Sequence, residues 1–242
     1  GGTRAVNVTQ KQQMFIIFFG MISAFVFIIN SFPADVGFVK ALTIAGATGK
    51  LDVIDFSLDL NNRYTFWSGI TGGLFLALSY FGTDQSQVQR YLSGKSLKES
   101  QLGLIMNGFL KVPMQFFILL VGVMVFVFYQ FEPAPIHFNP KAVEAIENST
   151  HAGDFKVLET ELEIIQEQKR ILLLQPNSID LKEVARLDHN EREIRSEVKN
   201  LIKMTAPEIE VNDKDYVFIS FILKYLPQGL IGLLLAVILS AA

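Results

Sequence analysis

Two ionisable side chains lie in or beside stretches of the sequence that otherwise suit the interior of a lipid bilayer. Asp84 follows an uncharged run over 64–83, and Lys111 interrupts an apolar run over 102–131. An ionised side chain at the bilayer centre costs at least ~2.5 kcal/mol when it faces lipid, so it usually faces a cavity instead. These two residues therefore predict a site that binds a solute or an ion reversibly within the membrane.

The composition gives little support to other kinds of chemistry. The 242 residues contain no cysteine, which excludes disulfides, a thiolate metal site and a thiol nucleophile. His137, His151 and His189 have no metal-ligand spacing, and we expect all three at the surface. A formal net charge of −3 argues against a nucleic-acid surface. We expect no enzyme activity, no organic cofactor and no nucleic-acid partner.

Four stretches are long and apolar enough to cross a bilayer as helices, since a hydrocarbon core of ~30 Å needs about 20 apolar residues. They are 14–34, 64–83, 102–131 and 216–242, the last two interrupted only by Lys111 and Lys224. Buried helices of a large soluble protein are the alternative, but soluble domains rarely hold four such runs. The pattern predicts a multi-pass protein in a lipid bilayer, and the two chain ends suggest an internal fragment of it.

Basic residues in short loops predict the orientation in a plasma (inner) membrane, because such loops face the cytoplasm. The N-terminal flank carries Arg4 and Lys11, and the link between the second and third stretches carries Arg90, Lys95 and Lys98. Both are therefore expected inside, which leaves residues 35–63 and 132–215 extracytoplasmic.

The chain is predicted to divide into three membrane helices (1–132), an extracytoplasmic domain (133–214) and a fourth membrane helix (215–242). The stretch "PAPIHFNP" at 133–140 reads as a connector in which proline blocks any helix. A turn at Pro176-Asn177-Ser178, with Ser178 or Asp180 as the following helix cap, separates two amphipathic segments.

Those segments, 154–175 and 179–204, carry apolar residues at heptad-like spacing, which predicts an antiparallel hairpin close to a two-stranded coiled coil. The expected stripes are Leu158, Leu162, Ile165 and Leu172 on the first helix, and Val184, Leu187, Ile194, Val198 and Leu201 on the second. The charged outer faces suit either a solvated surface or the docking of an extracytoplasmic partner at 154–204.

The second apolar stretch ends in residues that favour an interruption of the helix. Gly82 permits unwinding, and Thr83 and Asp84 can hydrogen-bond to freed backbone groups. A discontinuous helix at a solute site uses this chemistry. The alternative is an ordinary helix end at the inner interface, with Gln85 and the polar residues after it in water.

The position of Lys111 in its helix also allows two interpretations. It lies about nine residues inside its helix, roughly 13 Å along the axis at ~1.5 Å per residue, so it can snorkel to the cytoplasmic face or point inward. Pro113 removes a backbone hydrogen bond and predicts a kink beside the lysine. Asn107 and Gln115 add polar groups, and we favour an inward-facing Lys111.

Small residues form ridges on two stretches, which lets other helices approach closely in lipid. Pro227 is expected to start the helix of the fourth stretch. The ridges are Gly69, Gly73 and Ala77 on the second stretch, and Gly229, Gly232, Ala236 and Ser240 on the fourth.

Four motifs, in this order, resemble the sodium/solute symporter family, which transports sugars, amino acids, carboxylates, iodide and vitamins: "GGTRAVNVTQKQQ", "YFGTDQSQVQRYLSGKS", "FLKVP" and "LPQGLIGLLLAVILSAA". The resemblance covers residues 1–132 and 215–242. It implies an all-α LeuT-type fold of two inverted repeats, with sites at unwound helix segments. The first stretch would be the last helix of one repeat, and the others the first three of the next. The hairpin would be an insertion.

The resemblance also implies roles for individual residues. Tyr80 aligns with a tyrosine that closes the sugar site of the bacterial sodium/galactose symporter on its cytoplasmic side, and Lys111 with a lysine that contacts the sugar. Ala77 replaces a sugar-binding asparagine, which disfavours a galactose-like substrate. Asp84 and Gln85 complete the expected substrate site.

Sodium is the coupling ion that the resemblance implies. Ala241 aligns with a residue whose backbone carbonyl binds sodium. Thr9-Gln10 stands where the family usually has "TD", so one acid is missing. The form of "DQSQVQRYL" is close to that of monocarboxylate and vitamin transporters, which favours an organic anion that Lys111 could pair with.

Taken together, these features predict part of a secondary active transporter for sodium-coupled uptake of a small organic solute by alternating access. The solute would be a sugar, amino acid, carboxylate or vitamin. The alternative is a solute-sensing membrane domain of a signalling protein, which a kinase-type sequence further along the chain would favour.

Overall fold

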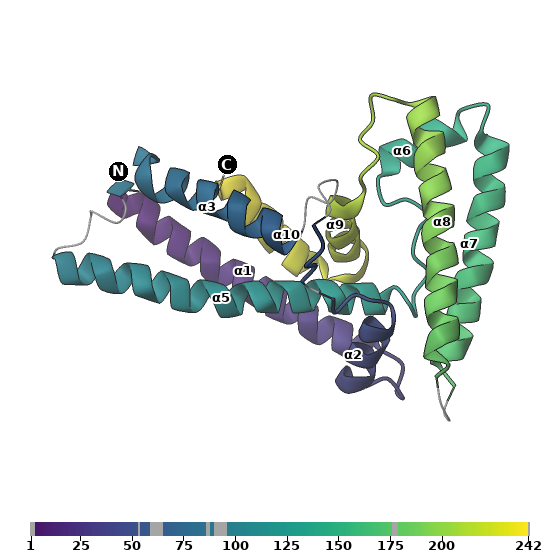
Figure 1. Cartoon of the computed structure of the whole chain (residues 1–242), viewed down its shortest axis with the longest axis horizontal. Coiled ribbons are helices and arrows are strands. Elements are labelled where there is room, and N and C mark those ends of the chain that lie inside the picture. Colours follow the sequence, from purple (N-terminus) through teal and green to yellow (C-terminus); the bar gives the residue numbers. More distant parts are fainter. Residues whose placement is uncertain are drawn as a thin grey trace. The chain divides into compact units, whose positions relative to one another are not determined.

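The computed structural model describes residues 3–52, 54–58, 65–85, 88–89, 96–175 and 179–241 (Figure 1). The secondary structure in these residues is helical throughout, which confirms the all-α class. The helices are α1 (Thr3–Ser31), α2 (Phe38–Ala47), α3 (Phe66–Gly82), α5 (Leu97–Phe128), α6 (Pro140–Glu147), α7 (Ala152–Leu173), α8 (Leu181–Thr205), α9 (Lys214–Tyr225) and α10 (Gln228–Ala241).

Two of these helices are long and apolar enough to cross a membrane by length and composition, Val8–Ser31 of α1 and the whole of α5. Of their most apolar 18 residues, only 17% and 22% are buried. A core helix of a soluble protein would be mostly buried, whereas most residues of these two helices are not buried in the described structure.

The other two predicted spans take a different form. α3 has 17 residues and ends at Gly82. The fourth stretch is not one helix, because α9 ends at Tyr225 and α10 starts at Gln228. Pro227 lacks the N–H that a continuous helix would use, so the apolar stretch over 216–242 forms two helices. The expected helix start at Pro227 holds to within one residue.

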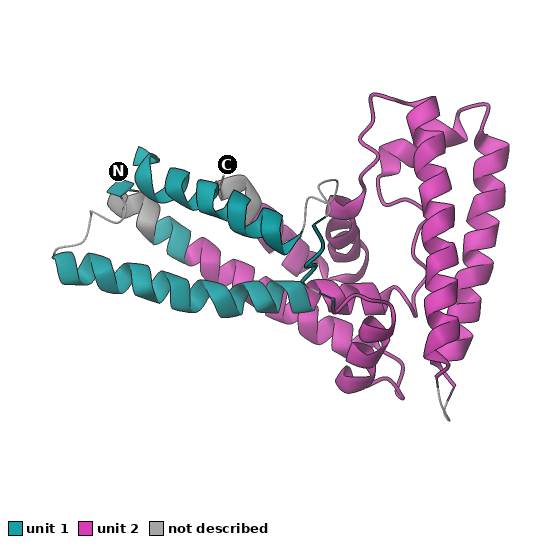
Figure 2. Ribbon diagram, in the orientation of Figure 1, with its two compact units in different colours: residues 1–11, 52–120 teal, residues 12–51, 121–242 magenta. Residues whose placement is uncertain are grey.

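The described structure forms two compact units, shown in different colours in Figure 2. Unit 1 comprises residues 1–11 and 52–120, which include α3 and most of α5. α3 begins with a capping box, in which the Thr65 hydroxyl accepts from the Ser68 N–H and the Ser68 hydroxyl accepts from the Thr65 N–H. No residue of α3 is buried, so its apolar faces remain open.

Unit 2 comprises residues 12–51 and 121–242. An aromatic cluster joins the end of α5 to α9, with the Phe128 ring 5.2 Å from Phe221 and 4.8 Å from Tyr225, both edge-on. α1 approaches α10 closely, because a Cβ atom at Gly20 would lie 2.7 Å from Cδ2 of Leu234. Among the described residues of unit 2, nothing lies within 4 Å of a Cβ at Gly229 or Gly232 of the predicted ridge on α10.

α7 and α8 of unit 2 lie side by side, and α6 packs against both (Figure 1). Phe155 and Leu162 of α7 share a buried cluster with Ile194, Val198 and Ile202 of α8. Burying each such side chain stabilises the fold by ~1.5–3 kcal/mol. Asp180 is the cap of α8, since its carboxylate accepts from the Lys182 and Glu183 N–H groups at 3.1 and 3.2 Å. The predicted turn at 176–178, including Ser178, lies outside the described residues.

The hairpin stripes agree with the sequence only in part. Leu162, Val184, Leu187, Ile194 and Val198 are buried as expected. Leu158, Ile165, Leu172 and Leu201 are half-buried. Besides Leu162, the buried residues of α7 are Phe155, Lys169 and Leu173.

Three local expectations were wrong or incomplete. The segment 35–63 contains the helix α2, which was taken as loop. Pro140 is the first residue of α6, with Asn139 as its cap, so the connector ends one residue earlier. His137 is 2% exposed rather than at the surface, because its Nε2 lies 3.2 Å from the Val211 carbonyl and its Nδ1 accepts from the Asn139 N–H. His151 and His189 are accessible, as expected.

Candidate solute and sodium site

α3 of unit 1 carries Ala77 and Tyr80 and ends at Gly82, just before Asp84 and Gln85. The carbonyl of Ser79 accepts from the Thr83 N–H at 3.0 Å, from the Thr83 hydroxyl at 2.9 Å and from the Asp84 N–H at 3.1 Å. A regular α-helix would reach back four residues from Asp84, whereas this bond reaches back five. α3 therefore ends at Gly82, where the sequence predicts a break, and the role of this break in a solute site stays a prediction.

Helical backbone resumes directly after the interruption. Gln85 is helical, and the Asp84 carbonyl accepts from the Val88 N–H at 3.0 Å. Gln87 and Arg90, which the alternative of an ordinary helix end places in water, lie outside the described residues. A nearby hydroxyl and a carboxylate at such a break supply oxygen groups, which are the ligands that hard cations such as sodium prefer.

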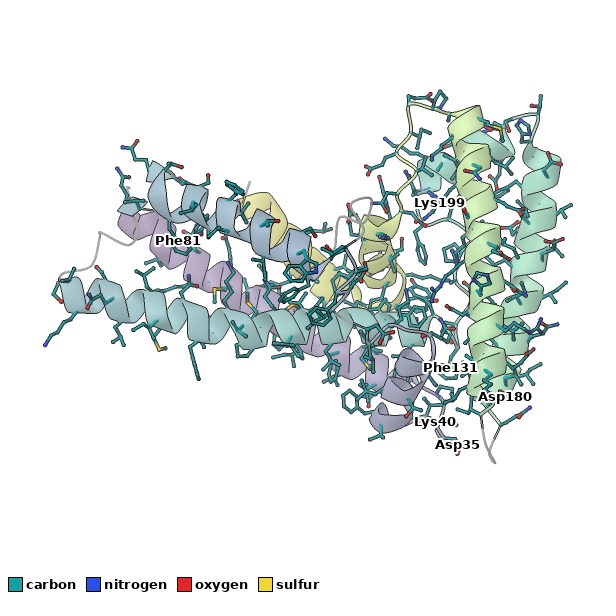
Figure 3. The ribbon with its side chains drawn as sticks, viewed as in Figure 1. Asp35, Lys40, Phe81, Phe131, Asp180 and Lys199 are labelled. Carbon is teal, nitrogen blue, oxygen red and sulfur yellow. The ribbon has the colours of Figure 1, made fainter. Side chains whose placement is uncertain are left out.

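The predicted substrate residues lie in unit 1, and the structure shows where each is placed. Ala77 and Tyr80 are three residues apart and therefore on one face of α3, with Ala77 half-buried and Tyr80 37% exposed. Asp84 is half-buried at the interruption, and Gln85 is exposed. Phe81, on the same turn as Tyr80, is labelled in Figure 3.

The remaining predicted residues lie on other helices. Lys111 is exposed on α5, which continues as a helix through Pro113. Ala241 is the last residue of α10 and belongs to unit 2. Among the described residues, no group of three or more histidine, aspartate or glutamate side chains is arranged to hold a metal ion. Sodium binding would depend on backbone carbonyls and hydroxyls instead, and the roles of these residues stay predictions.

A second polar cluster, which the sequence did not predict, is buried in the hairpin. Lys169 of α7 is 1% exposed, and its Nζ lies 2.5 Å from Glu191 Oε2 and 3.5 Å from Asp188 Oδ1 on α8. Arg195 pairs with Glu191 at 3.0 Å, and Arg192 pairs with Asp188 at 2.5 Å. Each buried charge thus has a partner of opposite sign, as burial requires.

The same arginines fasten the hairpin to the rest of unit 2. Arg195 donates from Nη1 to the carbonyls of Pro135 and Ile136, both at 2.8 Å. Arg192 donates to the carbonyl of Thr48, the residue that caps α2, at 2.9 Å. The cluster therefore links α7, α8, the connector and α2. Seven-residue spacing places Lys169 on the stripe of Phe155 and Leu162, and this was the signal that could have revealed it.

Two buried carboxylates of the hairpin region have lowered pKa values. Burial alone would raise the pKa of Glu191, but the charges of Lys169 and Arg195 and their hydrogen bonds outweigh it. Burial likewise opposes ionisation of Asp213, but the hydrogen bond from Lys199 and the Phe138 N–H hold its pKa below the usual value. Lys199 of α8 is labelled in Figure 3. Its Nζ lies 2.9 Å from Oδ1 of Asp213.

The chain is similar in sequence to several sodium-coupled transporters. The human sodium/iodide cotransporter is 34% identical over 108 residues, which are 44% of this chain and 16% of that protein. The mouse sodium-coupled monocarboxylate transporter 2 is 35% identical over 107 residues, which are 44% of this chain and 17% of that protein. The rabbit sodium-dependent multivitamin transporter is 32% identical over 137 residues, which are 55% of this chain and 20% of that protein.

The chain spans a fifth or less of the length of these relatives, all of which are transporters and not enzymes. No family profile and no solved structure matches the chain. The resemblance to the sodium/solute symporter family is confirmed, and over about half of its length the chain has the sequence expected of a fragment of that family.

Proposed function

We propose that the chain is part of a secondary transporter that couples sodium entry to the uptake of a small organic solute by alternating access. The observation that carries the proposal is the similarity to three kinds of sodium-coupled transporter. The interruption at Thr83 and Asp84 supports it, because discontinuous helices form the solute sites of many secondary transporters.

In this proposal, the turn around Asp84 and Gln85 and the face of Ala77 and Tyr80 contribute one side of the solute site. Lys111 supplies a positive charge. Relatives that carry monocarboxylates or iodide take anions, so a small organic anion is the favoured substrate class. The backbone carbonyl of Ala241 contributes to the sodium site in a LeuT-type arrangement.

The proposed topology follows the distribution of basic residues. The flank with Arg4 and Lys11 faces the cytoplasm, while the segments 35–63 and 132–215 are extracytoplasmic. The hairpin α7–α8 then projects from the outer side of a plasma membrane. Residues of α1 and α5 with exposed apolar side chains face lipid.

Uptake by the full-length protein in proteoliposomes tests the proposal. Radiolabelled lactate, iodide, biotin, proline and galactose are offered in an inward sodium gradient and in matched choline buffer. We expect accumulation of one of the anions that requires sodium, since the gradient supplies the driving force. Equal accumulation in choline, or none of any solute with correctly inserted protein, would overturn the proposal. The second outcome would favour a solute sensor.

A further inference from the structure

The outer face of α7 carries an apolar stripe that nothing in the described structure covers. Val157, Ile164 and Ile171 are 58%, 54% and 55% exposed, and each is seven residues from the next. The buried residues Phe155 and Leu162 lie on a different face of the same helix. α7 therefore has one apolar stripe that packs on α8 and a second that is open.

Seven-residue spacing is the pattern by which one helix recognises another. Side chains that recur every seven residues stay on one side of a helix, where they fit between the side chains of a partner helix. A surface that only met water would have no reason to repeat β-branched residues at this interval. The open stripe is thus suited to a further helix alongside the hairpin.

A groove beside the stripe identifies the chemistry of the partner. It has a volume of about 430 Å³ and is lined by Asp154, Val157, Leu158, Glu197, Asn200 and Leu201, so α7 and α8 both contribute. Three of its lining residues, Val157, Leu158 and Leu201, are apolar, and its two charged lining residues, Asp154 and Glu197, are acidic. Glu161 lies one turn along α7 from Val157 and is also exposed. A second copy of this chain would bring acidic edges against each other, which disfavours it as occupant.

We propose that this groove and the stripe of Val157, Ile164 and Ile171 bind an amphipathic helix of a partner protein whose apolar residues are flanked by lysine or arginine. The apolar side chains would supply the buried contact, and the basic residues would meet Asp154 and Glu197. The inference does not rest on sodium coupling, so failure of the binding test would leave the uptake test unaffected.

Two synthetic helices of equal apolar sequence serve as probes, one with lysine and one with glutamate at the positions that flank the stripe. Binding to the chain in lipid nanodiscs is measured by fluorescence anisotropy. We expect the lysine peptide to bind at least about tenfold more tightly than the glutamate peptide, a difference of ~1.4 kcal/mol. Failure of the lysine peptide to bind, or equal binding of both peptides, overturns the proposal.

Matched variants locate the binding. Glu197→Lys and Val157→Glu should each weaken binding about tenfold, whereas Glu163→Lys, the same charge reversal at an exposed position outside the groove, should have little effect. Circular dichroism checks that each variant remains folded. Equal losses in Glu197→Lys and Glu163→Lys would show general charge attraction and contradict a defined groove.

A cysteine variant tests a second copy as occupant. These 242 residues contain no cysteine, so Val157→Cys, in the full-length protein with any cysteine outside these residues replaced, introduces a single thiol into the stripe. Under mild oxidation we expect no disulfide-linked dimer in nanodiscs that hold two chains. Efficient cross-linking that the lysine peptide does not prevent would assign the groove to self-association and overturn the proposal.

Discussion

Replacement of Lys111 by alanine in the full-length protein is expected to abolish sodium-dependent uptake while leaving membrane insertion intact. A hydrogen bond to a charged group contributes ~1.5–3 kcal/mol, so its loss should lower the apparent solute affinity by about 10–150-fold. The side chain is exposed on α5, and its removal leaves no cavity in the described core. The measurement is radiolabelled uptake, with surface biotinylation as the check on insertion.

Lys98→Ala is the matched control, because Lys98 is an exposed lysine in the first turn of the same helix. Its loss should change uptake little, since it lies in the predicted cytoplasmic link. Lys111→Arg should retain part of the activity if charge is what matters. Normal uptake by Lys111→Ala would mean that the lysine only snorkels to the cytoplasmic face.

Replacement of Lys169 by alanine should destabilise the hairpin by ~1.5–3 kcal/mol, because Asp188 and Glu191 lose the buried cation that contacts both and keep only Arg192 and Arg195 as partners. The expected result is faster hydrogen exchange throughout α7 and α8 and a lower Tm. Arg170→Ala is the matched control. Its 3.4 Å pair with Glu167 is half-exposed, and such pairs contribute ~1 kcal/mol or less.

The same cluster should make hairpin stability depend on pH. The pKa of Glu191 is lower in the folded state than its unfolded value of ~4.3. Its contribution is therefore present above the unfolded pKa and is lost as the pH falls through the folded pKa. Lys169→Ala should reduce this pH dependence, and Lys169→Leu with Glu191→Leu should recover part of the lost stability. Wild-type stability in Lys169→Ala would show that Arg192 and Arg195 suffice to pair the acids.

The parts of the fold that depend on local sequence could be predicted. The hairpin helices follow from apolar periodicity, and Asp180 was among the expected caps because its carboxylate bonds only to neighbouring N–H groups. The interruption after Gly82 is likewise local, since Thr83 bonds back to Ser79 four residues earlier. These features need no knowledge of distant partners.

The parts that depend on distant contacts could not. His137 is buried beside a distant part of the chain, since its Nε2 lies 3.2 Å from the carbonyl oxygen of Val211, 74 residues away. α2 is short, and its end is fixed by Arg192, 144 residues from Thr48. Lys169 looked like a solvated charge until Asp188 and Glu191 were placed beside it. The predicted site divides in the same way. The shared helix face of Ala77 and Tyr80 follows from their spacing in the sequence, whereas the groups that contact Lys111 depend on how helices pack.

The accessibility of a single thiol at the interruption tests the central claim most directly. Thr83→Cys is introduced into the full-length protein, with any cysteine outside these residues replaced, and its reaction rate with a membrane-impermeant thiol reagent is measured with and without sodium. We predict reaction in water and a severalfold change of rate when sodium is added, while Leu76→Cys, on an exposed apolar face of α3, stays unreactive. A thiol at position 83 as unreactive as the one at position 76, or a rate that sodium leaves unchanged, would contradict a sodium-coupled pocket at this turn.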